Sequence, residues 1–402
     1  MDPYRRRTGR AKRLKLSVLM LCLLLIASGC NYFRPLPVAS AHLTPLTSEL
    51  SVATLAWPAS GQTAVGAVGY GMLDTHGGQS PMPTASLAKI ITGLAILQKK
   101  PLQPGSNGPT ITLGEHDIEL YNAYFKGGSA LLPVIKGEKI TEYQALQGMI
   151  LASANNVADS LAIWAFGSLD AYTRYANNMV RSMGLDHTTV ATDASGFSPN
   201  TKSTSADLVR LGEAALQHPV LGTILTQKSA KLPVAGTVYN INGVVDSLSI
   251  IGLKTGSTDQ APGCFLFAAK TTQGGKKITI VGALLGAPNV ITAIKQASVL
   301  AASAKANFET KTLVKANQPL GNLTTKWGAT APITARQDVT IVAWKGIPAT
   351  PKLSLQPLHG AVQAGDSVGT ITASSGTSHV SSPVIATKST VAPTLWWRLA
   401  RL

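Results

Sequence analysis

Two residues at the start of an apolar, helix-like stretch have side chains that could carry out nucleophilic chemistry together. Ser86 and Lys89 stand three positions apart in the motif Ser86-Leu87-Ala88-Lys89. Side chains at positions i and i+3 of a helix lie on the same face. A serine hydroxyl becomes a useful nucleophile when a base accepts its proton, and a lysine can do so once burial or nearby positive charge makes it neutral. The alternative is that Ser86 only caps a helix.

Two further short motifs follow along the chain. Ser153-Ala154-Asn155 lies between two helix-like segments, where side chains can point into a cleft. A simple helix-linking turn is the alternative, because serine and asparagine favour turns. Lys254-Thr255-Gly256 closes the strand-like run Ser247–Lys254. Each triplet alone is common by chance, so the signal is the presence of all three in this order.

This order resembles the nucleophile, proton-relay and carboxylate-binding elements of the penicillin-binding proteins and serine β-lactamases. Longer blocks resemble the low-molecular-mass penicillin-binding proteins of the serine D-alanyl-D-alanine carboxypeptidase type. These blocks are Pro83–Ile90, Ser195-Gly196-Phe197, Ser203–Leu208 and Leu253–Asp259 with Gly263. The resemblance implies an α/β (α+β) catalytic domain, with an antiparallel sheet and a helical cluster, followed by a small all-β domain.

The resemblance also implies a role for each residue of the first two motifs. Ser86 would attack the substrate carbonyl and Lys89 would accept the serine proton. Lys254 could supply the positive charge that helps burial to lower the pKa of Lys89. Ser153 would relay protons toward the leaving group, and Asn155 would hold the substrate amide.

The third motif would bind the substrate's other end. Lys254 and Thr255 would bind its carboxylate by charge and hydroxyl. Gly256 would let the substrate backbone approach the strand edge. The backbone N–H of Ser257 would complete an oxyanion hole with that of Ser86.

These roles imply a serine-type D-Ala-D-Ala carboxypeptidase that acts on peptidoglycan stem peptides through an acyl-enzyme on Ser86, needs no cofactor and binds β-lactam antibiotics covalently. The alternatives are a serine β-lactamase, a DD-endopeptidase and a catalytically weak wall-binding protein. Class A β-lactamases deacylate with a glutamate on a loop. Glu213, the only glutamate between Ser153 and Lys254, instead lies in the helix-like segment Ser203–Gln217. The sequence leaves open the third stem-peptide residue and the oligomeric state.

One family feature is missing from the chain. Family members usually carry an arginine after the turn that follows the last core strand, where it helps to grip the substrate carboxylate. The segment Gly286–Lys295 contains no arginine, and Ala293 is expected at the matching position. An Ala293→Arg variant is therefore expected to have a lower KM.

Local patterns predict several elements that would position these residues. Thr141-x-x-Gln144 is typical of a helix N-terminus with a capping box. Gly274-Gly275 predicts a hairpin turn between the strands Cys264–Thr271 and Lys276–Ala287. Val68–Leu73 has the composition of another strand.

Composition divides the chain into five parts. Residues 1–29 are predicted to be a signal peptide or signal anchor, 30–50 a tether, 51–309 the catalytic domain and 310–386 the small β domain. The tail 387–402 contains the short segment Trp396–Leu402, which is either a frayed end or a membrane-interface segment.

The N-terminus indicates export. A basic stretch precedes the apolar run Leu16–Ala27, which is shorter than the roughly 20 residues that span a bilayer. Cys30 follows small residues and is a candidate for lipidation. These features predict a protein at the outer face of the cytoplasmic membrane or in the cell envelope, held there by a lipid or an uncleaved anchor.

Composition also limits the partners. The chain has 402 residues, 45% of them hydrophobic and 13% charged, which argues against disorder. Its net charge of +16 suits an anionic membrane surface, but no motif supports nucleic-acid binding. The three cysteines offer no pair within the folded body, and the seven scattered histidines do not predict a metal site.

Overall fold

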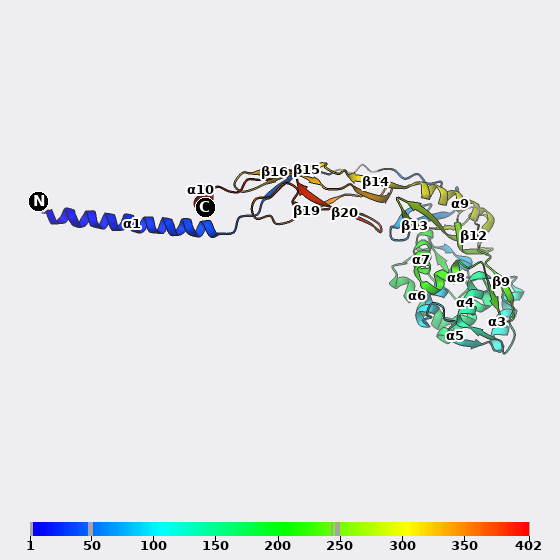
Figure 1. The fold of residues 1–402 in the computed structure, drawn as a ribbon. Helices are drawn as coiled ribbons and strands as arrows, with labels where there is room; N and C mark the ends of the chain where they lie inside the picture. Colours follow the sequence, from blue (N-terminus) through cyan, green and yellow to red (C-terminus); the bar gives the residue numbers. More distant parts are fainter. Residues whose placement is uncertain (1–2, 47–50, 243, 246–249, 402) are drawn as a thin grey trace. The chain divides into compact units, whose positions relative to one another are not determined.

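The computed structural model describes residues 3–46, 51–242, 244–245 and 250–401 (Figure 1). The chain divides into two compact units. The larger unit consists of Leu50–Glu309 and Val342–Ile347, and the smaller unit consists of Met1–Glu49, Thr310–Ile341 and Pro348–Leu402.

The larger unit is built on a six-stranded antiparallel sheet with the strand order β10-β11-β12-β13-β2-β3. Its strands are β2 (Gln62–Ala67), β3 (Gly71–His76), β10 (Val244–Val245), β11 (Ile250–Thr258), β12 (Ala261–Gln273) and β13 (Lys276–Leu285). Short two-stranded pairs accompany it, namely β4 (Met82–Pro83) with β7 (Lys202–Ser203), β5 (Thr110–Thr112) with β6 (Lys139–Thr141), and β8 (Ser229–Leu232) with β9 (Gly236–Tyr239).

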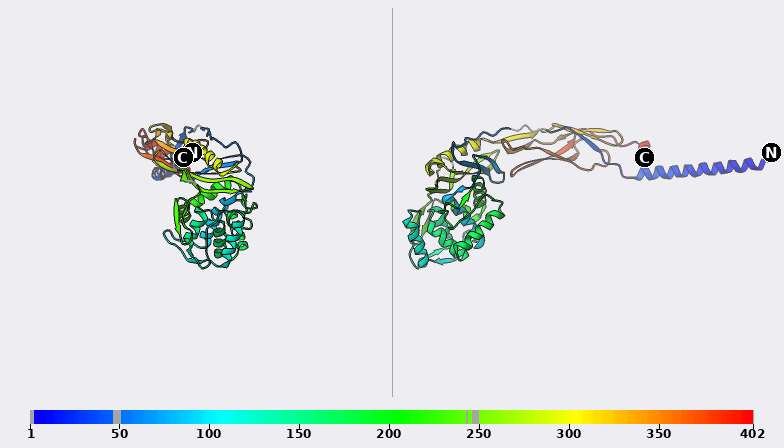
Figure 2. Two further views of the ribbon diagram at one scale, coloured as in Figure 1. Left: turned by 90° about the vertical axis from the view of Figure 1, so that its right-hand side faces the viewer. Right: turned by 180° about the vertical axis from the view of Figure 1, so that it is seen from behind.

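Helices cover both faces of this sheet (Figures 1 and 2). Helix α9 (Val290–Ala306) packs on one face. The other face carries the 3₁₀ turn η1 (Ala85–Ala88) and a helical cluster. The helices on that side are α2 (Lys89–Lys99), α3 (Glu115–Lys126), α4 (Glu142–Leu151), α5 (Asn155–Phe166), α6 (Leu169–Ser182), α7 (Ser205–Gln217) and α8 (Pro219–Leu225).

Strand β12 shows why the sheet needs cover on both sides. Phe265 and Phe267 point into the core beneath α9, whereas Leu266 and Ala268 point into the core of the helical cluster. Successive side chains of a strand alternate between faces, so a strand that is apolar at every position is stable only between two layers.

Two local features predicted from the sequence, a capping box and a hairpin turn, are confirmed by the structure. The Thr141 side chain accepts a hydrogen bond from the Gln144 backbone N–H, and the Gln144 side chain accepts one from the Thr141 N–H, which completes the capping box. Gly274 and Gly275 both have positive φ and join β12 to β13 with Gln273 opposite Lys276, so the hairpin is confirmed.

One predicted strand is only partly correct. Within Val68–Leu73, the residues Val68–Tyr70 form the turn between β2 and β3, whereas Gly71–Leu73 are the start of β3. Gly69 and Gly71 both have positive φ, a conformation that suits the turn and its exit into β3. The predicted strand Ser247–Lys254 corresponds to the start of β11, but its residues 247–249 lie outside the described part of the chain.

The smaller unit contains a second six-stranded antiparallel sheet, with the order β1-β15-β16-β20-β19-β18. Its strands are β1 (Ser40–Leu43), β15 (Pro319–Thr324), β16 (Thr330–Ala335), β18 (Lys352–Leu355), β19 (Ser367–Ser375) and β20 (Ser378–Ala386). Strands β14 (Phe308–Val314) and β17 (Val339–Trp344) form a separate pair. The prediction that 30–50 is only a tether is wrong for β1, because Ser40 pairs with Thr324 across a large sequence separation.

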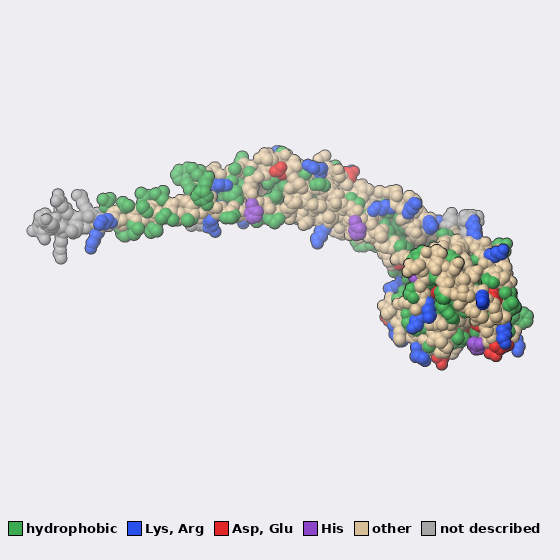
Figure 3. All heavy atoms as spheres, turned by 60° about the horizontal axis from the view of Figure 1, so that its bottom comes forward, with side chains coloured by type: hydrophobic (Ala, Val, Ile, Leu, Met, Phe, Trp, Pro, Cys, Tyr) green, Lys and Arg blue, Asp and Glu red, His purple; other side chains and the backbone are tan. Residues whose placement is uncertain are grey.

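The N-terminal segment forms the long helix α1 (Pro3–Phe33), whose apolar side chains are exposed (Figure 3). Its stretch Lys12–Phe33 has 22 residues with a mean hydropathy of 2.0. At a rise of about 1.5 Å per residue it is about 33 Å long, so by length and composition it could cross a bilayer or serve as a signal sequence. The apolar run Leu16–Ala27 is therefore part of a longer helix, which extends past it at both ends. Arg5, Arg6, Arg7 and Arg10 of the basic stretch lie outside the described side chains.

Candidate active site

The turn η1 places the predicted nucleophile beside the predicted base. Residues three apart in a 3₁₀ helix lie directly above one another, which brings Ser86 and Lys89 together. The Lys89 Nζ donates a hydrogen bond of 2.8 Å to the Ser86 Oγ. Lys89 is completely buried, whereas Ser86 is half-buried and can be reached from outside. A serine in contact with a desolvated amine is an arrangement for proton abstraction.

Lys89 Nζ has two further acceptors from distant parts of the chain. It donates to the Asn155 Oδ1 at 2.6 Å and to the backbone O of Ser195 at 2.9 Å. Burial lowers the pKa of Lys89 to about 7, and the negative charges of Asp193 and Asp159 oppose that lowering. At this pKa a substantial fraction of the amine is neutral near pH 7.

Lys254 lies near Lys89 but is not the main cause of its lowered pKa. The pKa of Lys254 is itself well below its usual value, first because of burial and then because of the charge of Lys89. Burial, rather than the charge of Lys254, therefore accounts for the state of Lys89.

Ser153 and Asn155 lie at the junction of α4 and α5. Ser153 is buried and has a φ of +57°, a left-handed conformation that costs a non-glycine residue energy and is concentrated at functional sites. Asn155 is the first residue of α5, and the Ala130 carbonyl accepts its backbone N–H at 2.9 Å. The junction therefore brings Asn155 to Lys89, and with it the second motif to the first.

Strand β11 presents Lys254 and Thr255, both of them buried, to an acceptor that the sequence analysis missed. The Asn242 Oδ1 accepts hydrogen bonds from Lys254 Nζ at 2.7 Å, from Thr255 N at 3.0 Å and from Thr255 Oγ1 at 3.0 Å. The Asn242 amide is held in turn by the Ile150 carbonyl at 2.8 Å. One buried amide thus orients both of the residues predicted to bind a carboxylate.

Two glycines allow the surrounding segments to approach η1 closely. A Cβ at Gly256 would lie 2.9 Å from Leu87 Cδ1 and 3.0 Å from the Thr84 carbonyl oxygen. A Cβ at Gly196 would lie only 2.1 Å from the Ala85 carbonyl oxygen. The missing side chain at Gly256 therefore allows the nucleophile turn to approach β11, and the predicted role of this glycine toward the substrate backbone stays a prediction.

Ser257 occupies an irregular position in β11. The pairing with β12 shifts between Gly256 and Thr258, where two β12 residues, Pro262 and Gly263, lie opposite Ser257, so the extra residue of this bulge belongs to β12. Bulges are frequent beside active sites. Its Oγ donates to the Pro262 carbonyl at 3.0 Å, which fixes the hairpin turn beside it.

A family comparison identifies the chain at this point. The family model described as D-alanyl-D-alanine carboxypeptidase matches residues 72–289, a segment that contains all three motifs. The chain belongs to the D-alanyl-D-alanine carboxypeptidase family. The α/β fold class and the family resemblance drawn from the motifs are thus confirmed.

Individual members of the D-alanyl-D-alanine carboxypeptidase family are moderately similar to the chain. A D-alanyl-D-alanine carboxypeptidase of Escherichia coli K12 is 28% identical over 205 residues, which cover 50% of this chain but only 49% of that protein. One from Streptomyces sp. strain K15 is 29% identical over 280 residues, covering 63% of this chain and 92% of that protein.

Solved structures of this family share the fold. Penicillin binding protein 5 from Haemophilus influenzae superimposes with a TM-score of 0.58 at 19% identity, covering 87% of this chain and 99% of that chain. The Streptomyces K15 DD-transpeptidase has a TM-score of 0.54 at 22% identity, covering 65% and 98% respectively. At these identities the likeness is one of fold.

The position predicted for the missing family arginine is wrong. Ala293 is fully buried in α9 and faces the sheet, in the same core as Phe265 and Trp344. An arginine there would have to be buried among apolar side chains, at high cost. Ala293→Arg is therefore not a route to a lower KM.

The structure also adds acidic and aromatic residues around the site that the sequence analysis did not assign. Asp193 accepts hydrogen bonds from three backbone N–H groups, those of Ser195, Phe197 and Ser198, and thereby shapes their loop. The block Ser195-Gly196-Phe197 was the available signal for that loop, but no local pattern pointed to Asp159, Tyr124 or Asn242.

Other candidate groups lie away from the site or remain predictions. Glu213 lies within α7, as expected. Cys264 is buried, and burial raises the pKa of its thiol to about 12, whereas Cys22 and Cys30 are exposed on α1. Among the residues that the structure describes, no three His, Cys, Asp or Glu side chains group together in a way that could hold a metal ion.

Proposed function

We propose that this chain is a serine D-Ala-D-Ala carboxypeptidase that removes the terminal D-alanine from peptidoglycan stem peptides. The observation that carries the proposal is the 2.8 Å contact between Ser86 Oγ and the buried Nζ of Lys89, in a chain of this family. In this assignment residues 51–309 are the catalytic domain and 310–386 the small β domain.

Acylation follows from the contacts of Lys89. The neutral Lys89 amine takes the Ser86 proton while Oγ bonds to the penultimate D-Ala carbonyl carbon. The N–H groups of Ser86 and of Ser257, which lies opposite the β12 bulge, stabilise the oxyanion. The C–N bond then breaks, and Ser153 passes the proton to the nitrogen of the departing D-alanine.

Substrate orientation falls to Asn155, Lys254 and Thr255. Because Asn155 Oδ1 accepts from Lys89, the Nδ2 of the same amide donates to the substrate carbonyl. Lys254 and Thr255, aligned by Asn242, attract the terminal carboxylate. Water then attacks the acyl-enzyme, forming the acid and returning the proton to Ser86.

Labelling with a fluorescent penicillin tests the assignment. The wild-type protein should form a long-lived covalent adduct, Ser86→Ala should form none, and Ser229→Ala on the exposed strand β8 should behave as wild type. The wild type should also release D-alanine from a synthetic peptide that ends in D-Ala-D-Ala. Labelling that survives in Ser86→Ala contradicts the nucleophile, and rapid turnover of penicillin supports a β-lactamase instead.

Attachment to the outer face of the membrane is the second part of the proposal. Helix α10 (Leu395–Ala400) of the smaller unit lies against the end of α1. Asn31 Nδ2 donates to the Arg401 carbonyl at 2.8 Å, and Arg401 Nε donates to the Asn31 carbonyl at 3.0 Å. Trp396 is 78% exposed there.

These contacts support a single membrane-contacting site to which both ends of the chain contribute. They involve residues that follow Cys30, so they persist whether Cys30 is lipidated after cleavage or α1 stays uncleaved. One anchor alone often binds the membrane reversibly, and a second weak contact beside it makes membrane binding more stable. Mass spectrometry of the mature N-terminus separates the routes, because a peptide that still carries Leu16–Ala27 excludes lipidation at Cys30.

A further inference from the structure

A buried carboxylate that the proposed mechanism does not use lies close to the catalytic lysine. Asp159 stands on α5 one turn after Asn155, and positions i and i+4 of a helix share a face. Asn155 is in direct contact with Lys89 Nζ. Asp159 is only 2% exposed, so its charge is barely screened by water.

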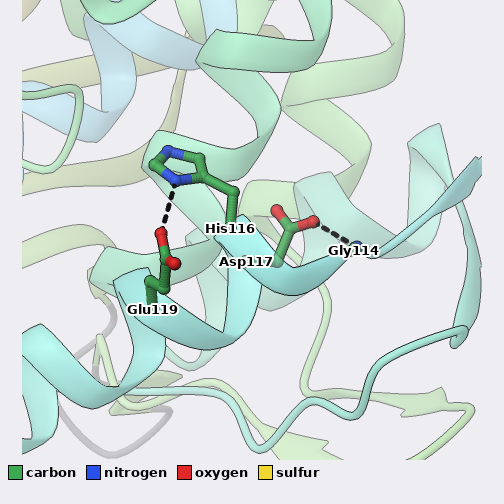
Figure 4. A network of polar contacts seen from close by, with 4 residues as sticks. All are labelled: Gly114, His116, Asp117 and Glu119. Carbon is green, nitrogen blue, oxygen red and sulfur yellow. Dashed lines mark hydrogen bonds and ion pairs between the residues drawn. The ribbon is translucent and has the colours of Figure 1, made fainter.

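Asp159 is held in place by two donors. The Tyr124 hydroxyl donates to Oδ2 at 2.7 Å, and the backbone N–H of Ala194 donates to Oδ1 at 2.8 Å. Tyr124 comes from α3, whose start is fixed by the Asp117 carboxylate accepting the Gly114 N–H at 2.7 Å (Figure 4). Two separate segments therefore converge on this carboxylate.

A chain of contacts links Asp159 to Lys89. Tyr124 OH lies 3.3 Å from Ser195 Oγ, and the carbonyl of the same Ser195 accepts the Lys89 ammonium at 2.9 Å. Ser195 Oγ also donates to Asp193 Oδ1 at 2.6 Å. Displacing Tyr124 would thus disturb the acceptor that orients Lys89.

The two carboxylates near Lys89, those of Asp193 and Asp159, differ in how many hydrogen-bond donors they receive. Asp193 receives four donors, three of them backbone N–H groups. Asp159 receives two, and burial raises its pKa to about 6. The charge of Asp159 raises the pKa of Lys89, and the charge of Lys89 lowers that of Asp159, so the two groups influence each other's protonation.

Other ionisable groups face this pair from the remaining elements. Lys254 on β11 also interacts with Lys89, and burial and the charge of Lys89 lower the pKa of Lys254 itself. On α6, the Tyr172 hydroxyl contacts Thr92 at 2.7 Å, and burial raises the pKas of Tyr172 and Tyr124 beyond any working pH. Asp159 and Asp193 are therefore the acids whose charge opposes the neutral form of Lys89.

We propose that Asp159, held by Tyr124, is a positioning residue that sets the pH range in which Lys89 can act as the base. The inference rests on the proposed function for its effect on the reaction, but not for its effect on Lys89. A negative Asp159 favours the ammonium form of Lys89. Replacing it with a neutral, similarly shaped asparagine removes this attraction, so Lys89 loses its proton at lower pH.

The test combines two measurements on wild type, Asp159→Asn and Tyr124→Phe. The first is an NMR titration of Lys89 in protein carrying isotope-labelled lysine, with the signal assigned by its loss in Lys89→Ala. The second is the pH profile of the penicillin acylation rate. Asp159→Asn should lower the midpoint of the Lys89 titration by about one pH unit, and the acidic side of the acylation pH profile should shift down by the same amount. Tyr124→Phe removes a donor that stabilises the Asp159 charge and should give a smaller shift in the same direction.

Asp170→Asn, an exposed acid on α6, is the matched control and should move neither curve. An unchanged Lys89 titration in Asp159→Asn, or in Tyr124→Phe if the first variant does not fold, overturns the inference. A wild type that fails to react with penicillin refutes the proposed function instead, and the NMR titration still decides the role of Asp159.

Discussion

Gly196 offers the sharpest test of how the site is assembled, because it has both an unusual backbone conformation and no room for a side chain. Its φ is +77°, and an added Cβ would lie 2.1 Å from the Ala85 carbonyl oxygen and 2.7 Å from Ala88 Cβ. Ala85 and Ala88 are the two ends of η1. Gly196→Ala should therefore push away the turn that carries the nucleophile.

The size of the effect follows from two separate costs. An alanine in the left-handed region costs about 1–2 kcal/mol, and overpacking of a tight core costs a further ~1–3 kcal/mol. Gly196→Ala should then lose roughly 2–5 kcal/mol of unfolding free energy. A shift of η1 by about 1 Å should also slow acylation by about 100-fold.

Gly236→Ala is the matched control for this variant. Gly236 has a similar φ of +69°, but an added Cβ there meets no atom within 4 Å. It should lose only about 1–2 kcal/mol and acylate normally. Urea denaturation and the penicillin acylation rate measure both effects. Equal destabilisation of the two variants, with normal acylation in Gly196→Ala, would refute the reasoning.

Two further predictions concern the buried polar groups. Asn242→Ala removes the hydrogen-bond acceptor that Lys254 and Thr255 share. The KM for a D-Ala-D-Ala peptide should rise about tenfold, which corresponds to a loss of about 1.4 kcal/mol of substrate-binding free energy, and kcat should change less. An unchanged KM would show that Asn242 does not orient these residues. The pKa of Lys89 is about 7 in the folded protein, below its usual 10.5. Between these two pH values the unfolded state therefore binds more protons than the folded state. The contribution of Lys89 to the free energy of unfolding becomes less favourable as the pH falls through that range. Lys89→Met should remove this part of the pH dependence in denaturation curves, and an identical slope in both proteins would contradict the buried, neutral lysine.

Local features of the fold could be predicted because their causes lie within a few residues. The spacing of Ser86 and Lys89 places both on one face of any helical turn, whether 3₁₀ or α. The capping box at Thr141 and the hairpin at Gly274-Gly275 depend on adjacent backbone groups, and both form as expected. The motifs' order was likewise sufficient to indicate the family.

Errors arose where the decisive partner is distant in the sequence. Strand β1 was missed because its partner β15 follows almost the whole larger unit, and a four-residue segment has little pattern of its own. Ala293 was misjudged because only the packing of α9 on the sheet decides which side of the helix is buried. The close approach of η1 to Gly256 was not predicted because the position of η1 against β11 is a tertiary contact.

The sequence by itself therefore determined which reactive side chains this protein has and which of them are neighbours along one turn. Only the tertiary structure decided their chemical state. Lys89 becomes a base because folding removes it from water and surrounds it with Asn155, Ser195 and Asp159, which come from segments far from η1. Desolvation and the field of nearby charges depend on three-dimensional distance, and that distance is not encoded in any local pattern of residues.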